Sequence, residues 1–421
     1  MKPGILLLAP KTTYRFKDFL QAAEKVQASV LVASDRCRNL GHFDNVKEIS
    51  LAFNKPQQAI EKITHFLKGR HLDAIIPVDD NAVSLAAFLA HAYGLAANPL
   101  SSTRICKNKF LFRQKLAQTS LPAPRYGLIP LLQRHPVCPP HLSFPVVIKP
   151  LLLSGSRGVI RANSPQEFTQ ACSRIEHILG EREFAVHKTK AWRTLLVEEY
   201  IPGKEYAVEG MLTAGTLDIL TLFDKPDPLE GPFFEETIYV TPSLLEKSRQ
   251  DEIRSVLQRA CTAIGLTTGP VHAEVRLNDR GIFIIEIAAR TIGGLCARLV
   301  RYATGCALEK IVVHHALGQP IARPDFKGKA AGVMMIPIPG YGILRSVDGL
   351  DAARAVKGVQ DIEITAERES LIVPLPEGKS YLGFIFAGGE TVKEVDRSLR
   401  QAHALLAFDI RAGLPVLEHG G

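Results

Sequence analysis

Short apolar runs alternate with segments of helical periodicity along the first hundred residues. The predicted strands are apolar and of strand length, at residues 5–9, 30–33 and 74–77. The predicted helices repeat apolar positions every three or four residues, at residues 16–26, 56–67 and 82–93. This alternation predicts a doubly wound α/β domain with a parallel sheet.

Asp79 and Asp80 directly follow the third predicted strand. Open α/β sheets bind ligands at the carboxyl edge of their strands, so these carboxylates are candidates for a site. Capping of the helix that begins near Ala82 is an equally open interpretation.

The pattern becomes mixed after a turn-rich boundary at residues 98–102. Further strands are predicted at residues 144–149, 159–162, 194–200, 205–212 and 217–223, and helices at 108–117, 165–179, 295–302 and 308–317. Beyond a linker at 318–324, the predicted elements are strands at 331–338, 362–364 and 381–386 and a helix at 391–406. We therefore expect three domains, at residues 1–100, 101–320 and 321–421, the last two being α+β.

A hairpin is predicted from residue 271 to residue 288, where two strands flank Asp279, Arg280 and Gly281. A three-residue loop with Gly281 in the left-handed conformation would place Asn278 opposite Ile282. Counting back four residues on each strand then places Glu274 opposite Glu286.

Two opposed carboxylates repel each other, and Glu286 also lies within an isoleucine-rich strand. A magnesium ion would relieve both costs, because Mg²⁺ binds a few carboxylate oxygens together with phosphate oxygens and water. The alternative is a salt-bridge cluster in which Glu274 or Glu286 pairs with Arg276 or Arg290.

Composition describes an ordinary folded protein of 421 residues, with 46% hydrophobic and 22% charged residues. No apolar run approaches the roughly 18 residues of a membrane span, and residues 5–9 are too short for a signal-peptide core. We therefore expect a cytoplasmic protein. Seven cysteines without a C-x-x-C pair predict reduced, mostly buried thiols and no zinc site or disulfide framework, at residues Cys37, Cys106, Cys138, Cys172, Cys261, Cys296 and Cys306.

The net charge of +8 is concentrated between residues 81 and 166, which contain no Asp or Glu. The basic residues there are Arg104, Lys107, Lys109, Arg113, Lys115, Arg125, Arg134, Lys149, Arg157 and Arg161. Such a segment attracts anions. A small phosphorylated ligand is favoured over nucleic acid, because no array of aromatic stacking positions is visible.

No P-loop motif is present, so phosphate binding needs another arrangement. The order of Lys109, Lys149, the small-residue loop 154–158, the run Glu198-Glu199-Tyr200-Ile201, Glu205, Glu274 and Glu286 resembles the ATP-grasp superfamily over essentially the whole chain. The resemblance implies an ATP-grasp fold, with an N-terminal doubly wound domain, a central ATP-grasp domain and a small C-terminal α+β domain. It also implies ATP with Mg²⁺, or Mn²⁺, as cofactors.

The resemblance assigns roles residue by residue. Lys109 and Lys149 resemble the phosphate-binding lysines, Lys149 also being catalytic, and Ser154, Gly155 and Ser156 resemble the loop that covers the phosphates. Glu198, Glu199 and Ile201 resemble the adenine-binding hinge, and Glu205 the carboxylate that binds the ribose. Glu274 and Glu286 would hold the metal.

Many members of the superfamily carry Asn two residues after the second metal glutamate, where this chain has Ala288. A small residue there, followed by Arg290 and a glycine turn, is similar to the L-amino acid ligase branch, as are the C-terminal runs 374–378 and 381–387. That branch implies a catalytic Arg290 against the reacting carboxyl group. His272, Arg290 and Gly294 are the candidate substrate contacts.

The function so implied is ATP-dependent joining of a carboxylate, such as that of an amino acid, to an amine or a second amino acid. Small-molecule substrates are the expected partners, without nucleic acid or membrane, and a homodimer is compatible with the sequence. Three alternatives remain open: an ATP-grasp enzyme of purine synthesis or bicarbonate activation, a nucleotide-binding regulatory protein without catalysis, and a nucleic-acid binder.

Overall fold

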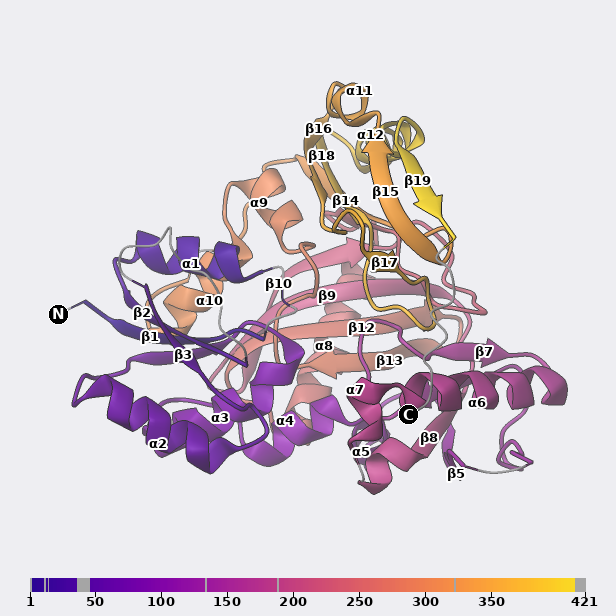
Figure 1. Cartoon of the computed structure of the whole chain (residues 1–421), viewed down its shortest axis with the longest axis horizontal. Coiled ribbons are helices and arrows are strands. Elements are labelled where there is room, and N and C mark those ends of the chain that lie inside the picture. Colours follow the sequence, from indigo (N-terminus) through magenta and orange to yellow (C-terminus); the bar gives the residue numbers. More distant parts are fainter. Residues whose placement is uncertain are drawn as a thin grey trace. The chain divides into compact units, whose positions relative to one another are not determined.

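The computed structural model describes residues 2–10, 13, 15–35, 46–132, 135–187, 189–321 and 323–412. Cys37 and Arg134 lie outside these ranges. The chain forms two compact units, the first from residues 1–123, 205–223 and 243–327, the second from residues 124–204, 224–242 and 328–421 (Figure 1). The predicted domain boundaries near residues 100 and 320 stay a prediction.

The first unit opens with the predicted parallel sheet, in the order β3-β2-β1-β4. Its strands are β1 (Gly4–Leu8), β2 (Ser29–Ser34), β3 (Val46–Ser50) and β4 (Ala74–Pro77). Helices α2 (Pro56–Leu67) and α3 (Val83–Ala92) cover one face, and α1 (Phe16–Lys25) and α10 (Leu308–Ala316) pack together on the other (Figure 1). The doubly wound prediction is confirmed. Sequence reasoning missed β3, because its polar residues hide a strand pattern.

The same unit contains the antiparallel strands β13-β12-β9-β10. These strands are β9 (Lys204–Thr213), β10 (Thr216–Asp224), β12 (Gly269–Asn278) and β13 (Gly281–Ala288). Helices α5 (Lys109–Leu116) and α8 (Lys247–Ile264) share a buried core with them, whose members include Phe112, Leu257, Val275 and Ile284.

Three helices complete the elements of this unit: α4 (Leu100–Lys107), α9 (Arg298–Thr304) and the short η1 (Asp80–Ala82). The turn-rich boundary predicted at residues 98–102 is wrong from Leu100 onward, because α4 begins there. Asn98 does lie in the connection, where its side chain bonds the backbone of Thr267 and Thr268. Sequence reasoning also missed α8.

The second unit holds an antiparallel sheet of order β5-β8-β6-β7 and the strands β11-β14-β18-β16. The first set is β5 (Tyr126–Pro130), β6 (Val146–Pro150), β7 (Ile160–Ala162) and β8 (Thr194–Glu199), with α6 (Pro165–Gly180), α7 (Arg182–Ala185) and η2 (Lys190–Arg193) nearby in sequence. The second set is β11 (Ile238–Thr241), β14 (Ala330–Ile336), β16 (Val359–Ile364) and β18 (Gly383–Gly389), with α11 (Leu350–Arg354) and α12 (Val392–Ala404).

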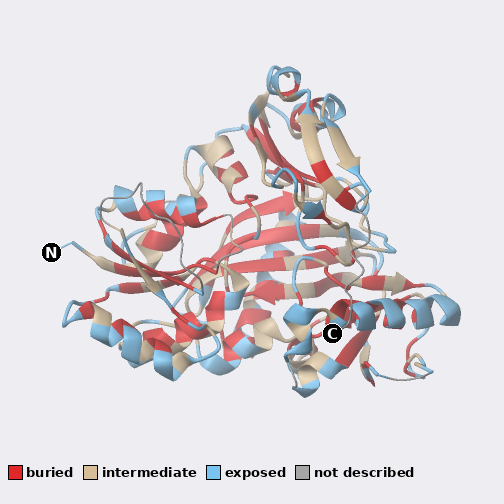
Figure 2. Ribbon diagram, in the orientation of Figure 1, coloured by how far each residue is buried: buried red, intermediate tan, exposed pale blue. Residues whose placement is uncertain are grey.

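A small sheet of order β17-β15-β19 completes the unit, from β15 (Gly342–Asp348), β17 (Leu371–Ile372) and β19 (Ala407–Arg411). Buried residues concentrate on the strands of both units and on the inner faces of their helices (Figure 2). The predicted α/β and α+β class is therefore confirmed. None of the helices in the described part of the chain is both long enough and apolar enough to cross a membrane, and the cytoplasmic location stays a prediction.

Three described cysteines are buried, Cys172, Cys261 and Cys296, and three are partly buried, Cys106, Cys138 and Cys306. Burial raises the pKa of the Cys261 thiol to about 12 and, together with the nearby Cys138, that of Cys172 to about 12. Since the thiolate is the reactive form, both thiols should be inert in the folded protein.

We expect Cys172 and Cys261 to resist iodoacetamide at pH 8 in the native protein and to react fully in denaturant. Peptide mass spectrometry after timed alkylation measures this. Equal rates with and without denaturant would contradict the buried placement.

Candidate active site

The β12–β13 hairpin pairs Glu274 directly with Glu286, as predicted, but by a different route. The loop has two residues rather than three, because Asn278 pairs with Gly281. That register alone would pair Glu274 with Ile285. A β-bulge next to Glu274 leaves Ile285 without a partner on β12 and brings the two carboxylates opposite each other.

Arg113 of α5 holds this bulge. Its guanidinium donates to the carbonyl oxygens of Ile284 at 3.1 Å and Ile285 at 2.7 Å, and the residue is only 2% exposed. From sequence, Arg113 was counted only among the basic residues of the segment expected to attract anions. Its helical spacing beside Phe112 and Leu116, both buried, was the available signal.

The strand face that carries Glu274 is polar, as predicted, and its charges are paired across to β9. His272 Nδ1 lies 2.6 Å from Glu209 Oε1, and its Nε2 lies 3.7 Å from Glu274. Arg276 donates from Nε to Glu205 at 2.8 Å. Burial alone would lower the pKa of His272, but its bonds with Glu209 and Glu274 raise it to about 9. The histidine is therefore a cation beside Glu274 at neutral pH.

Arg290 follows β13 and meets the carboxyl edge of the parallel sheet. Its Nε lies 3.4 Å from Asp80 Oδ1, and its Nη1 donates to the carbonyl of Thr291 at 2.9 Å. Burial lowers the pKa of Arg290, yet Asp80 and Glu286 raise it above its ordinary value overall. Asp79 accepts from the Asn81 backbone at the start of η1, which confirms the capping interpretation for that residue.

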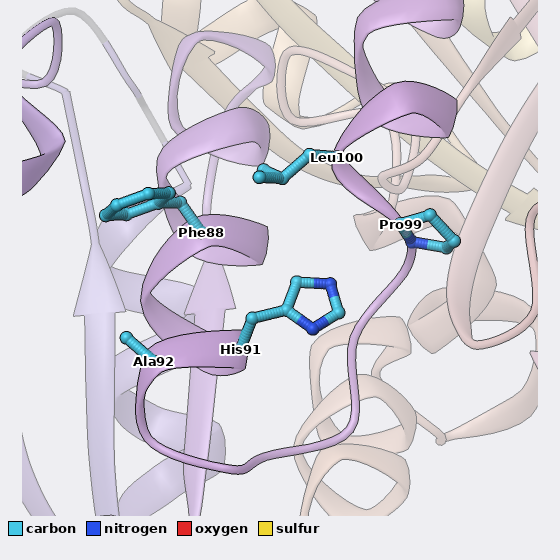
Figure 3. Close-up of a pocket in the computed structure, with 5 residues that line it drawn as sticks. All are labelled: Phe88, His91, Ala92, Pro99 and Leu100. Carbon is cyan, nitrogen blue, oxygen red and sulfur yellow. The ribbon is translucent and has the colours of Figure 1, made fainter.

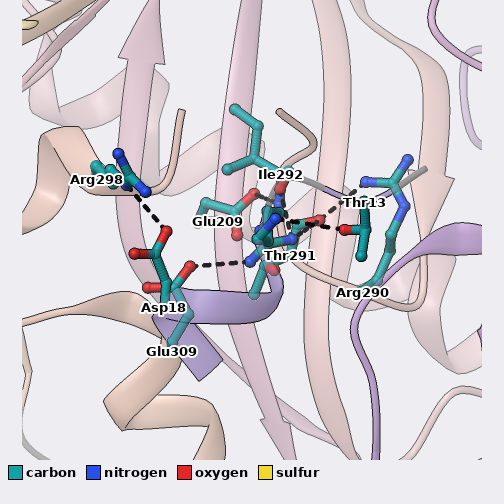
Figure 4. Close-up of polar contacts among 9 residues, drawn as sticks. Thr13, Asp18, Glu209, Arg290, Thr291, Ile292, Arg298 and Glu309 are labelled. Carbon is teal, nitrogen blue, oxygen red and sulfur yellow. Dashed lines mark hydrogen bonds and ion pairs between the residues drawn. The ribbon is translucent and has the colours of Figure 1, made fainter. Parts of the chain in front are cut away.

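The loop after Arg290 is tied to buried charges from α1, α10 and β9 (Figure 4). Arg15 donates to the Ile292 carbonyl at 2.8 Å and pairs with Glu309 at 3.1 Å. Glu209 accepts from the Ile292 N–H at 2.9 Å, so the same carboxylate anchors this loop and His272. Gly294, also in this loop, has a φ of +59°, a conformation that favours glycine.

In the second unit, Lys149 is the next-to-last residue of β6 and is only 8% exposed. Its Nζ lies 2.5 Å from a carboxylate oxygen of Glu198, on the adjacent strand β8. The structure thus brings one predicted phosphate lysine and one predicted hinge residue together. Glu199 turns its side chain to Arg125, at 3.0 Å, and its N–H donates to the Arg125 carbonyl. Ile201 is buried.

The small-residue loop forms a turn at residues 155–158. Ser154 and Gly155 are exposed, and Gly155 and Ser156 have φ values of +63° and +55°. In the first unit, Lys109 is the first residue of α5, directly after the Asn108 cap.

A separate apolar pocket lies on the first unit between α3 and the start of α4 (Figure 3). Its lining consists of Phe88, His91, Ala92, Pro99 and Leu100. None of these residues belongs to the predicted site, so this pocket is not the candidate active site.

A sequence model described as ATP-grasp domain matches residues 142–298. A second, described as L-amino acid ligase C-terminal domain 2, matches residues 334–411. Residues 142–298 therefore form an ATP-grasp domain, of the superfamily that the sequence resembles. The match at residues 334–411 agrees with the predicted resemblance to the L-amino acid ligase branch.

Two curated relatives agree with this placement. Dapdiamide A synthase of Enterobacter agglomerans is 28% identical over 67% of this chain and 67% of its own length. Alanine–anticapsin ligase of Bacillus subtilis is 23% identical over 64% of this chain. The match spans only 60% of that relative's length.

The fold is shared with the L-amino acid ligase from Bacillus licheniformis. That crystal structure superposes with a TM-score of 0.81, covering 97% of this chain and 99% of the other at 23% identity. The predicted ATP-grasp fold is confirmed by this likeness.

Replacing Arg113 with Met should destabilise the first unit by roughly 3 kcal/mol, because two buried carbonyl oxygens at the bulge would lose a charged donor. Urea unfolding followed by circular dichroism measures the change. The matched control is Arg280→Met in the exposed hairpin loop, for which we expect little change. Equal stability of the Arg113 and Arg280 variants would show that Arg113 does not stabilise the bulge.

The raised pKa of His272 predicts a pH-dependent stability. The stabilisation should be complete below the unfolded pKa of about 6.5 and should disappear as pH rises through the folded value of about 9. In EDTA, we expect the unfolding free energy of the wild type to fall between pH 7 and 10 more steeply than that of His272→Asn. Parallel pH profiles would show that His272 is not held as a cation.

Proposed function

We propose that this ATP-grasp protein is a ligase that joins an amino acid carboxyl group to an amine or a second amino acid, with ATP and Mg²⁺. The carboxylate would first accept the γ-phosphoryl group of ATP, giving an acyl phosphate and ADP. The amine nitrogen would then attack the acyl carbon, and phosphate would leave. Both steps balance without any other reactant.

The observation that carries this proposal is the enforced opposition of Glu274 and Glu286 in an ATP-grasp hairpin that continues into Arg290. Two carboxylates at such a position repel unless a cation lies between them. Arg276 has a carboxylate partner in Glu205, and Arg290 has one in Asp80. The imidazole of His272 lies 3.7 Å from Glu274, so support for a metal site comes from the paired glutamates within the ATP-grasp match at residues 142–298.

Magnesium fits these donors, since two carboxylates together with phosphate oxygens and water satisfy its preferred octahedral shell. When bound, it would neutralise charge on the transferred phosphoryl group. Manganese has the same preference for oxygen and would fit as well. Ala288, which lies opposite His272, supplies no ligand where related enzymes have Asn.

Lys149 and Lys109 would bind the phosphates of the nucleotide, and the tip of the loop at Ser154, Gly155 and Ser156 would cover them with backbone N–H groups. The ion pair with Glu198 holds the Lys149 ammonium in place. Glu199 and Ile201 would contact the adenine. Because the N–H of Glu199 donates to Arg125, its contact would come from the carbonyl oxygen.

Glu205 would accept hydrogen bonds from the ribose while it keeps its bond to Arg276. Its carboxylate can do both, since each oxygen has more than one lone-pair site.

Arg290 would act on the reacting carboxyl group, stabilising the acyl phosphate and then the oxyanion formed by amine attack. Asp80 and the Thr291 carbonyl orient its guanidinium. His272 and Gly294 would contribute to the pocket around it. The buried bonds to Ile292 would keep the adjoining loop rigid.

The match of residues 334–411 favours amino acid ligation over the enzymes of purine synthesis and bicarbonate activation. The names of the relatives, a dapdiamide synthase and an alanine–anticapsin ligase, point to the same substrate class.

Arg290→Ala should reduce turnover about a hundredfold or more, because a donor to the developing oxyanion is lost, whereas MgATP binding should persist. Coupled detection of ADP measures turnover, and calorimetry measures binding. Arg280→Ala in the hairpin loop is the matched control, with expected turnover near that of the wild type. Near-normal turnover of Arg290→Ala would remove this arginine from the mechanism.

Glu286→Gln should abolish Mg²⁺-dependent formation of ADP, since one carboxylate of the metal pair is lost. Unchanged ADP formation would return Glu286 to the salt-bridge interpretation.

Pairwise screening of amino acids for phosphate release, with mass detection of the product, identifies the substrates. Phosphate release with bicarbonate, or with a purine precursor, and not with amino acids would support the alternative enzyme class. Binding of ATP without ADP formation for any acid and amine would support a regulatory protein, and steeply salt-dependent oligonucleotide binding a nucleic-acid binder.

A further inference from the structure

The small-residue loop rests on the C-terminal segment 374–379, and both belong to the second unit. Gly158 donates its N–H to the Pro376 carbonyl at 2.9 Å. Arg157 donates from Nε to the Glu377 carbonyl at 2.7 Å. Two consecutive loop residues are therefore bonded to two consecutive carbonyls of a segment more than two hundred residues away in sequence.

Arg157 is buried and its charge is neutralised locally. Its Nη2 lies 2.7 Å from Glu181, its Nη1 pairs with Glu183, and its guanidinium lies 4.7 Å from the centre of the Phe184 ring. Its side chain is only 7% exposed. An arginine with two carboxylate partners and a carbonyl acceptor is fixed in position, so its role differs from that of a direct phosphate ligand.

The C-terminal segment is itself anchored to α6. Arg174 makes a two-pronged pair with the Glu377 carboxylate, with Nη2 at 2.9 Å from Oε2. Burial alone would raise the pKa of Glu377, but the hydrogen bond and charge of Arg174 outweigh that effect. The pKa is therefore lowered overall, and the carboxylate stays ionised at neutral pH. A side chain at Gly378 would meet the Val373 carbonyl at 1.8 Å, so the shape of the segment requires glycine there.

The loop thus has a tip, Ser154 to Ser156, in which Ser154 and Gly155 are exposed and Ser156 is partly buried, and a buried base, Arg157 and Gly158. We propose that Arg157 is a positioning residue for ATP, which fixes the base of the loop on segment 374–379 so that the C-terminal region sets how the tip holds the phosphates. This inference rests on the proposed nucleotide role of the loop. In this inference the C-terminal run 374–378 supports the loop, although none of its residues takes part in the proposed reaction.

The test compares Arg157→Gln with the wild type by hydrogen exchange of peptides covering residues 153–159, with and without MgATP. Loss of a charged hydrogen bond should speed exchange at the loop and weaken MgATP binding about tenfold. We expect the KM for ATP to rise with kcat changed less, because the loop acts on nucleotide binding rather than on the reacting carboxyl group.

Arg174→Gln tests the same support from a more exposed position, and should shift exchange and KM in the same direction but less. Arg400→Gln is the matched control, because Arg400 pairs with Asp227 and Asp396 at 46% exposure, against 43% for Arg174. That control should match the wild type in both measurements. Because Arg174 is exposed, its variant keeps the test informative even if Arg157→Gln does not fold.

The proposal would be overturned if Arg174→Gln and folded Arg157→Gln both exchanged at residues 153–159 at the wild-type rate, or both bound MgATP with the wild-type affinity. The ligase function fails separately, if the wild type binds MgATP but forms no product with any acid and amine. In that case the exchange and binding measurements still decide whether Arg157 positions the loop.

Discussion

The pairing of Glu274 with Glu286 is the feature on which the candidate site in the first unit depends. A bulge places the two residues opposite each other, and Arg113 fixes that bulge through the carbonyls of Ile284 and Ile285. Without the bulge, Glu274 would pair with Ile285, and the two acidic residues would be out of register.

Two cationic side chains lie close to this pair of glutamates. His272 lies against Glu274, and Arg290 lies close enough to Glu286 for that carboxylate to raise its pKa. Each cation is in turn held by another carboxylate, Glu209 for His272 and Asp80 for Arg290. The outer carboxylates orient the cations and offset their charge.

Local patterns in the sequence predicted most of the strands and helices and the facing glutamates, because periodicity and apolar content determine these features. The predicted hairpin loop was one residue too long. The bulge shifts the pairing by one residue as well, so the prediction that Glu274 faces Glu286 was still correct. Glu209 shows the same signal as Glu286, a charged residue within an apolar strand, since it lies between Val208 and Gly210 on β9. It was nevertheless not among the predicted site residues.

The partners of other site residues could not be predicted from sequence. Arg15 bonds to Ile292, and Arg113 bonds to Ile284, across separations of 277 and 171 residues. Helical spacing could have indicated that Arg113 is buried, but no local pattern identifies the carbonyl it binds. Only the folded chain brings the partners together, so roles that depend on tertiary contacts must be read from structure.

The bulge at Ile285 also limits how this hairpin can vary among related chains. Losing or gaining one residue between the loop and Glu286 would place an isoleucine opposite Glu274 and turn the glutamate toward the apolar core. Such a change would be tolerated only with a compensating change of loop length. We therefore expect that a one-residue insertion or deletion in β13 of a related chain is accompanied by a one-residue change in the hairpin loop.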